Sequence, residues 1–290
     1  MPSTYTPLRY PGGKTKMGSY LAGVMRTNRL VDAGYAEPYA GGAGAGLYLL
    51  FRGYASRLYL NDIDRGVVSF WRAVLSRNED FAKRIERVPL TVAEWDRQKS
   101  TFTTAPMGFD LGFAFFYLNR TNRSGIMNGG IIGGRRQTGG WGIDARFNRG
   151  ELAARVRALL AFRRQICVTR SDALDFLDGL PAGASKVLTY LDPPYYQKGQ
   201  DLYTNFYEEE DHAEIAQHLH GYCNPWIMTY DACDEIRALY RNHTVLDSEV
   251  SYSARQVRRG AELVIFGPGV RRPGETEDRS RRRRRGFQVC

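Results

Sequence analysis

The residues Asp192, Pro193, Pro194 and Tyr195 have the types and the order needed to hold a planar polar group. The carboxylate of Asp192 and the carbonyl of Pro193 can each accept a hydrogen bond from an amino group, and Tyr195 can stack on a ring. The two consecutive prolines stiffen the turn. The four residues alone are equally compatible with a strand that ends in a proline-rich turn, so the rest of the chain has to decide.

The segment before Asp192 favours a binding site. Residues 186–191 are nearly all apolar or β-favouring, which is typical of a strand buried on both faces of a parallel sheet. Ligands of open α/β sheets bind outside the carboxyl ends of such strands. The sequence therefore predicts that Asp192 lies where a ligand would bind.

A glycine-rich turn at residues 41–46 follows a strand expected at 35–38 and opens a helix expected at 47–51. Backbone N–H groups at a helix N-terminus, with no Cβ atoms in the way, let a ligand approach closely. The spacing does not satisfy the dinucleotide pattern G-x-G-x-x-G, because Leu47 stands where the third glycine belongs. The turn alone therefore does not support a dinucleotide site.

Asp62 strengthens the prediction of a cofactor site. It lies 20 residues after Gly42, at the end of a strand expected at 57–60. An acidic side chain at that position can hold both hydroxyls of a ribose. A ribose holder without a pyrophosphate pattern predicts an adenosine-type cofactor that carries no diphosphate.

The composition limits the class of protein. With 290 residues, 43% of them hydrophobic, the chain can form one large domain or a domain with a sizeable insertion. No apolar run reaches the length of a membrane span, the N-terminus lacks a signal-peptide core, and the four cysteines are scattered, so a cytoplasmic protein is expected. We expect no metal site, because His212, His218 and His220 do not share a helix face and should be solvated.

The net charge of +10 predicts a polyanionic partner. The segment 271–290 has eight arginines against three acidic residues and supplies half of that charge, +5. We expect this tail to be disordered, because Arg281 to Arg285 form one block of like charges. The body of the chain keeps the other +5.

The alternation of strands and helices resumes after the middle of the chain. A helix opened by Asp211, with Glu214 completing a capping box, is expected between two of the strands, and a second helix extends to about Tyr240. This pattern predicts a doubly wound, mostly parallel α/β sheet, with an antiparallel hairpin of the last two strands at one edge. The strands of this part are expected at 165–169, 186–191, 226–230, 244–250 and 262–266.

The middle segment, residues 66–164, has a different character. It begins with helical patterns and then becomes rich in glycine and arginine at residues 119–125 and 129–136. Such a loop can approach a phosphate backbone and place guanidinium groups against guanine edges. An ordinary long surface loop is the alternative, although loops of this length are more often functional or disordered.

A last motif lies near the N-terminus. Residues 9–14 combine an arginine, an aromatic residue, a tight glycine turn and Lys14, but they lack the spacing of a phosphate-binding loop. Taken alone they predict only a turn.

Taken together, five ordered motifs resemble the Dam-type (D12 class) DNA adenine-N6 methyltransferases. The resemblance covers about residues 8–266, nearly the whole chain except the tail. The motifs are Arg9-Tyr10-Pro11-Gly12-Gly13-Lys14, Glu37-Pro38-Tyr39-Ala40-Gly41-Gly42, Asn61-Asp62-Ile63, Leu118-Asn119-Arg120-Thr121 and Asp192-Pro193-Pro194-Tyr195.

The resemblance implies an enzyme that uses S-adenosylmethionine, has a Rossmann-like fold and methylates double-stranded DNA in a bacterial or phage-infected cell, near the nucleoid. Residues 1–65 and 165–270 would form the methyltransferase domain, residues 66–164 an inserted target-recognition region that is mainly helical and loop, and residues 271–290 the tail. A cognate restriction nuclease is a possible partner, and the oligomeric state stays undefined.

The resemblance also assigns residues to roles. Asp192, Pro193, Pro194 and Tyr195 would be catalytic. The cofactor would be bound by Tyr10, Lys14, Glu37, Pro38, Tyr39, Gly41, Gly42, Gly44, Asp62 and Asp192. DNA would be bound by Asn119, Arg120, Asn122, Arg123, Arg135, Arg136 and Arg258.

The chain departs from the family pattern at three places, and two alternative functions stay open. The family often has Trp in place of Tyr10 and Phe in place of Tyr39, and residues 123–142 do not match the recognition hairpin of GATC-specific members, so the recognised sequence is undefined. An RNA or protein-glutamine N-methyltransferase usually carries Asn in place of Asp192. A non-catalytic DNA-binding relative would not need an intact Asp192, Asp62 and glycine turn.

Overall fold

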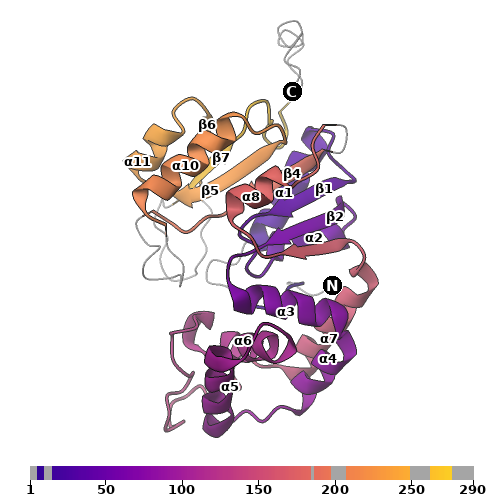
Figure 1. Ribbon diagram of the computed structural model, residues 1–290, viewed down its shortest axis with the longest axis vertical. Helices are drawn as coiled ribbons and strands as arrows, with labels where there is room; N and C mark the ends of the chain where they lie inside the picture. Colours follow the sequence, from indigo (N-terminus) through magenta and orange to yellow (C-terminus); the bar gives the residue numbers. More distant parts are fainter. Residues whose placement is uncertain (1–4, 10–14, 184–185, 197–206, 249–261, 276–290) are drawn as a thin grey trace, which may run out of the picture.

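The computed structural model describes residues 5–9, 15–183, 186–196, 207–248 and 262–275. These residues form a seven-stranded sheet in the order β3-β2-β1-β4-β5-β7-β6 (Figure 1). The strands are β1 Ala33–Glu37, β2 Ala55–Asn61, β3 Ile166–Thr169, β4 Val187–Leu191, β5 Trp226–Asp231, β6 Thr244–Ser248 and β7 Glu262–Phe266.

The first five strands run parallel, and β7 inserts antiparallel between β5 and β6. The prediction of a doubly wound, mostly parallel sheet with an antiparallel last hairpin is confirmed. In such a sheet the two halves of the chain leave in opposite directions from the β1–β4 pair. That pair is therefore the topological switch point.

Helices cover both faces of the sheet, because side chains alternate along each strand. In β5, Ile227 packs into the core on the side of α1 (Thr15–Thr27) and α2 (Gly44–Phe51). Its neighbours Trp226 and Met228 pack into a second core. That second core lies under α8 (Ala173–Asp178), α10 (Glu209–His220) and α11 (Asp234–Leu239). The central strands are thus buried on both faces, which explains their continuous apolar sequence.

A helical region is inserted between β2 and β3 and lies at the lower end of the molecule in Figure 1. Its core is aromatic, with Phe70 stacked on Phe116 at a centroid distance of 6.0 Å. Gly112 allows close packing of two helices, since a Cβ there would lie 2.5 Å from the backbone oxygen of Ser69. The helices are α3 Arg65–Ser76, α4 Asn78–Arg87, α5 Val92–Thr104, α6 Phe109–Thr121 and α7 Arg149–Ala158, with short 3-10 turns at Arg123–Gly125 and Leu159–Phe162.

Two local expectations are wrong. The helix α10 begins at Glu209, and the Asp211 carboxylate accepts a hydrogen bond of 2.8 Å from the backbone of Glu208, so Asp211 lies inside the first turn and does not start the helix. The tail does not leave the fold at residue 271. Arg271 exchanges two hydrogen bonds with the side chain of Asn28, just after α1, and residues beyond 275 lie outside the described part of the chain.

None of the helices in the described ranges combines the length and the apolar character that crossing a bilayer requires.

Candidate functional site

The carboxyl ends of β1, β2 and β4 meet at one edge of the sheet, at the switch point. Tyr35 of β1 pairs in register with Leu188 of β4 and with Leu58 of β2. The residues that follow these strands are therefore neighbours in space. This edge is where open α/β sheets bind their ligands.

The glycine-rich turn is fixed by hydrogen bonds to Asp62. Oδ2 of Asp62 accepts a hydrogen bond of 2.9 Å from the backbone N–H of Gly41, and Oδ1 accepts one of 2.9 Å from that of Asp64. On the other side, the indole N–H of Trp71 donates to the carbonyl of Gly41 at 2.9 Å. Gly41 and Ala43 both have left-handed backbone conformations, with φ of 44° and 45°. The turn and the end of β2 form one bonded unit.

Desolvation raises the pKa of Asp62 to about 7, and its hydrogen bonds oppose that shift only in part. A carboxyl group in this state gains from further donors, because hydrogen bonds to the charged form favour ionisation. The two hydroxyls of a ribose are donors of that kind. The residues present therefore fit an adenosine-type cofactor at this position.

Glu37 joins the end of β1 to the start of α2. Its Oε1 accepts hydrogen bonds of 3.0 Å from the hydroxyl of Tyr35 and of 3.0 Å from the backbone N–H of Gly46. Burial raises the pKa of Glu37 to about 8, and the nearby Asp192 adds to the shift. The side chain thus supports the glycine turn from inside, next to Asp192.

Asp192 follows β4 and is tied to β5. Its Oδ1 accepts a hydrogen bond of 2.8 Å from the hydroxyl of Thr229, which is 2.8 Å from the hydroxyl of Tyr190. Thr229 is fully buried, while Asp192 is half-buried at the edge. Pro193 and Pro194 are both buried. The carboxylate is oriented by the sheet itself.

The next two residues are held by acidic residues on β5 and β7. The hydroxyl of Tyr195 donates a hydrogen bond of 2.6 Å to Oε1 of Glu262, and the backbone N–H of Tyr196 donates one of 2.9 Å to Oδ1 of Asp231. Burial and the nearby Asp192 raise the pKa of Tyr195. The hydroxyl therefore stays protonated and available as a donor.

Aromatic side chains from four segments of the chain form a cluster that includes Tyr39. The hydroxyls of Tyr39 and Tyr207 are 2.9 Å apart, and Nδ1 of His212 is 2.6 Å from the hydroxyl of Tyr230. His212 is buried, and burial lowers its pKa. The expectation that His212 is solvated is wrong. Its spacing from the buried residues Ile215, Ala216 and Leu219 is that of one helix face, a signal present in the sequence.

The structure brings together most of the residues that the resemblance assigns to the cofactor and to catalysis. They lie at the end of β1, on the loops after β1, β2 and β4, or at the start of α2: Glu37, Pro38, Tyr39, Gly41, Gly42, Gly44, Asp62, Asp192, Pro193, Pro194 and Tyr195. Tyr10 and Lys14 lie outside the described residues. Sequence reasoning missed Thr229, Asp231 and Glu262. Of these, only Asp231 had a signal, since it ends a buried strand in the same way as Asp192.

Two residues assigned to DNA have structural roles in the described chain. Asn119 is buried, and it exchanges hydrogen bonds of 2.7 and 2.6 Å with the backbone of Arg9. Asn122 is buried and accepts from the indole of Trp95 at 2.7 Å, while its amide donates to the carbonyls of Ile126 and Met127. The polar side-chain atoms of both residues hold the loop within the protein, and DNA contact by either residue stays a prediction.

The predicted DNA-binding arginines differ in their surroundings. Arg135 forms a two-pronged ion pair with Asp96, at 2.8 and 2.7 Å. Arg123 is exposed and donates to the carbonyl of Gly129 at 2.8 Å, Arg136 is exposed, and Arg258 lies outside the described residues.

Arg120 is partly buried and lies in a cationic group with Arg9, Arg146 and Arg155. Burial, followed by the repulsion of Arg155 and Arg9, lowers the pKa of Arg120 to about 10, and Glu151 opposes the shift. Within the described residues the buried Nε of Arg120 has no hydrogen-bond partner. Such a group is suited to an anion that supplies the missing acceptors.

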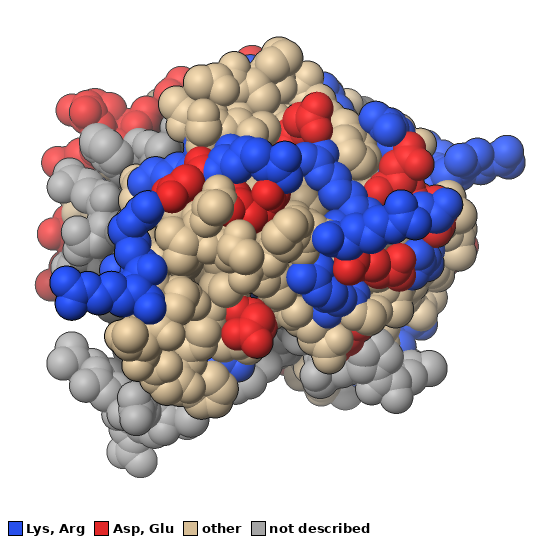
Figure 2. All heavy atoms as spheres, turned by 90° about the horizontal axis from the view of Figure 1, so that it is seen from below, with Lys and Arg blue, Asp and Glu red and all other residues tan. Residues whose placement is uncertain are grey.

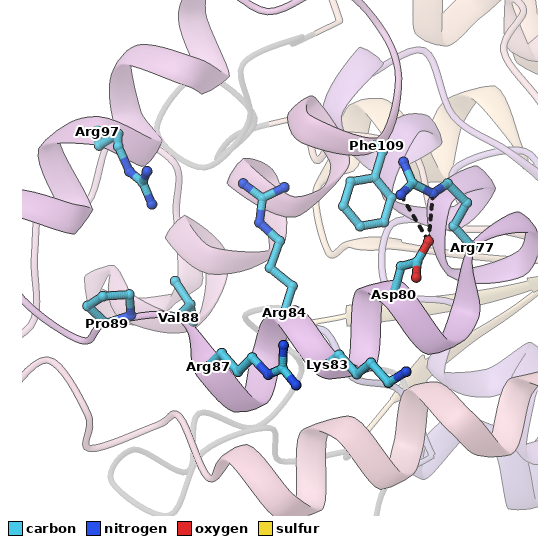
Figure 3. A pocket seen from close by; sticks show the side chains of 9 residues that line it. All are labelled: Arg77, Asp80, Lys83, Arg84, Arg87, Val88, Pro89, Arg97 and Phe109. Atoms are coloured by element: carbon cyan, nitrogen blue, oxygen red, sulfur yellow. Dashed lines mark hydrogen bonds and ion pairs between the residues drawn. The ribbon is translucent and has the colours of Figure 1, made fainter.

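A pocket of about 420 Å³ lies on the helical region, away from the sheet edge that carries Asp62 and Asp192, and Figure 3 shows its lining. Arg77 pairs with Asp80, Arg84 with Asp110, and Arg97 with Glu94. Figure 2 shows the same mixture of basic and acidic side chains over the lower face of the molecule. These cations are largely neutralised within the protein.

The fold and the site define a Rossmann-like protein whose ligand edge combines a glycine turn with strand-end carboxylates. The sequence profile of the D12 class N6 adenine-specific DNA methyltransferases matches residues 10–254. The chain belongs to this family of methyltransferases.

Comparisons with individual proteins add little. No curated protein matches the chain. Among solved structures, the candidate methyltransferase yhhF from Escherichia coli has a TM-score of 0.35 and 12% identity over 87% of this chain and 84% of its own. A conserved hypothetical protein from Streptococcus pyogenes has a TM-score of 0.35 and 11% identity over 82% of this chain and 88% of its own.

Proposed function

We propose that the protein transfers a methyl group from S-adenosylmethionine to N6 of an adenine that has been flipped out of double-stranded DNA. The observation that carries the proposal is the juxtaposition of Asp192, oriented by Thr229, with the glycine turn held by Asp62 across the β1–β4 switch point. Family membership supports it independently.

The cofactor would be held by Asp62 at its ribose and by the backbone of the glycine turn, with Tyr10 and Lys14 as further proposed contacts. When bound, S-adenosylmethionine supplies an electrophilic methyl group. Glu37 keeps the turn in place through hydrogen bonds from the Tyr35 hydroxyl and the Gly46 amide. Neither of these two groups carries a positive charge. The protein's own residues then have to present the acceptor nitrogen.

The exocyclic nitrogen of adenine is a poor nucleophile, because its lone pair is delocalised into the ring. The carboxylate of Asp192 and the carbonyl of Pro193 would each accept a hydrogen bond from one of its N–H groups, which turns the lone pair toward the methyl group. One of the two protons would leave to solvent once the N–C bond has formed. Tyr195 would stack on the adenine ring and offset a cost of a few kcal/mol for removing the base from the duplex. Holding both reactants in line corresponds to effective molarities of ~10⁵ M or more.

The cationic group around Arg120 supports DNA as the substrate. A partly buried guanidinium with a lowered pKa, whose Nε has no partner among the described residues, is costly in the free protein. A backbone phosphate would supply charge and acceptors together, which compensates that cost on binding. Arg123 and Arg136, on the exposed loop, are the proposed contacts to the bases.

The test is methyl transfer from radiolabelled S-adenosylmethionine to a randomised-sequence duplex DNA pool, followed by mass spectrometry of the nucleosides. N6-methyladenine is the expected product, and Asp192→Ala is the control. The same assay with RNA and with glutamine-containing peptides addresses the alternative acceptors. Binding of S-adenosylmethionine without any methylated DNA would contradict the proposal, and absence of cofactor binding would favour a non-catalytic DNA-binding protein.

A further inference from the structure

We propose that Glu262 is a positioning residue that fixes the ring of Tyr195 for stacking on the target base. This inference rests on the proposed function and deepens it. Its basis is the hydrogen bond of 2.6 Å between the Tyr195 hydroxyl and Oε1 of Glu262, two residues that are 67 positions apart in the chain.

The bond is short, and it joins a phenol hydroxyl to a carboxyl oxygen. Glu262 is 8% exposed and is the first residue of β7, so its backbone is fixed on both sides by pairing with Asp231 of β5 and Ser248 of β6. Tyr195, in contrast, lies on a turn after β4 and is half-buried. This hydrogen bond, called the tether below, therefore links the Tyr195 side chain on a loop to the fixed backbone of the sheet.

The position of Glu262 is unfavourable for stability alone. It lies directly opposite Asp231 in the antiparallel pair, and both carboxyl groups are buried. Like charges opposite each other destabilise a sheet. Each of the two is bonded to one of two consecutive residues, Glu262 to the side chain of Tyr195 and Asp231 to the backbone of Tyr196. The two acidic residues together hold the turn that carries the catalytic motif.

The tether acts on the orientation of the ring. A tyrosine ring on a turn can rotate about its side-chain bonds, and stacking on a base requires one orientation. A fixed hydroxyl removes that freedom before the base arrives, so less ordering remains to be done on binding. Glu262 does not touch the base in this proposal, and its effect passes through Tyr195.

The test is a double-mutant cycle in the methyl-transfer assay, with Glu262→Ala, Glu262→Gln, Tyr195→Phe and the double variant Glu262→Ala/Tyr195→Phe. We expect Glu262→Ala and Tyr195→Phe each to lower kcat on the order of tenfold, the effect expected for removing one hydrogen bond. The double variant should be no slower than the slower single variant. Glu262→Gln keeps an acceptor oxygen and should recover most of the activity, and the affinity for S-adenosylmethionine should change less than about twofold.

A second measurement reports on stacking itself. Duplex DNA with 2-aminopurine at the target position should fluoresce more strongly when bound to Glu262→Ala or Tyr195→Phe than when bound to the wild type, because looser stacking quenches less. The exposed Glu214 of α10 provides a matched control, and Glu214→Gln should behave as the wild type in both measurements.

The outcomes separate the two proposals. A wild-type protein that methylates no adenine overturns the proposed function. An active wild type, combined with multiplicative effects in the double variant or with unchanged kcat in Glu262→Ala, overturns only the positioning role. Tyr195→Phe removes one oxygen and no core volume, so it keeps the test valid should Glu262→Ala fail to fold.

Discussion

The hydroxyl of Thr229 donates a hydrogen bond of 2.8 Å to Oδ1 of Asp192. A threonine hydroxyl has a single hydrogen, so the neighbouring hydroxyl of Tyr190, 2.8 Å away, must be the donor in the second contact. Tyr190, Thr229 and Asp192 thus form a directed chain that ends on the carboxylate. The chain fixes the orientation of the Asp192 carboxylate.

Replacing Asp192 with alanine should abolish methyl transfer while the fold stays intact. Asp192 lies at the end of a strand and half-buried, so the substitution removes a site contact and little core volume. We expect the single-turnover rate to fall on the order of a thousandfold, as for loss of a preorganised hydrogen-bonding group at the reacting atom. Circular dichroism should be unchanged. A rate within a few-fold of the wild type would remove Asp192 from the mechanism.

Replacing Thr229 with valine tests whether orientation of Asp192 matters. Valine has nearly the same shape but no hydroxyl, so Asp192 loses this one donor and Tyr190 loses this one acceptor. We expect kcat to fall on the order of tenfold. Thr229→Ser keeps the hydroxyl and should retain most of the activity. If valine and serine give equal rates, the hydroxyl has no role in the reaction.

Replacing Asp62 with alanine should weaken S-adenosylmethionine binding and leave DNA affinity nearly unchanged. Its carboxylate holds the glycine turn at Gly41 and lies where a ribose would be bound. We expect the dissociation constant to rise about tenfold or more. Titration calorimetry of cofactor and of DNA separately checks both parts. Unchanged cofactor affinity would contradict the assignment.

Asp62 should also make the unfolding free energy depend on pH. Its pKa is about 7 in the folded protein, against about 4 in an unfolded chain. Between these values the folded state holds a proton that the unfolded state has released, so stability falls as pH rises from about 4 to 7 and then levels off. In Asp62→Asn this contribution is absent. Urea unfolding of both proteins at several pH values should give profiles that are not parallel over this range.

The sheet could be predicted from the sequence because its strands are buried on both faces and are therefore continuously apolar. Residues 262–266 are all apolar after Glu262, and the strand has those bounds in the structure. The site residues that follow the strands could also be predicted, because the carboxyl ends of parallel strands converge at one edge of the sheet. Local chemistry at a strand end is a signal that does not depend on distant contacts.

The parts that were missed depend on contacts between distant segments. Nothing local marks Glu262 as the partner of Tyr195, because the pairing of β5 with β7 creates that contact. Asn119 and Asn122 have the composition of a DNA-reading loop, yet their amides are used up by the backbone of Arg9 and of the loop itself. A polar residue on a sequence gives no indication of whether its partner is a ligand or the protein.

The Arg-rich tail and the helical-region loop should have separable effects on DNA binding. Deleting residues 276–290 keeps the hydrogen bonds between Arg271 and Asn28, and it should weaken binding to all sequences alike. The slope of log K against log salt should decrease in magnitude by roughly 0.9 for each phosphate group that the shortened chain no longer neutralises.

Replacing the exposed Arg136 with glutamine should instead reduce the preference for target over non-target DNA, because a base-reading arginine contributes about 1–3 kcal/mol of discrimination. Arg135→Gln is the matched comparison and should change selectivity less, since Arg135 is already bound to Asp96. Methylation of a randomised DNA pool at several salt concentrations measures all three variants, and a tail deletion that alters the methylated motif would contradict this division of roles.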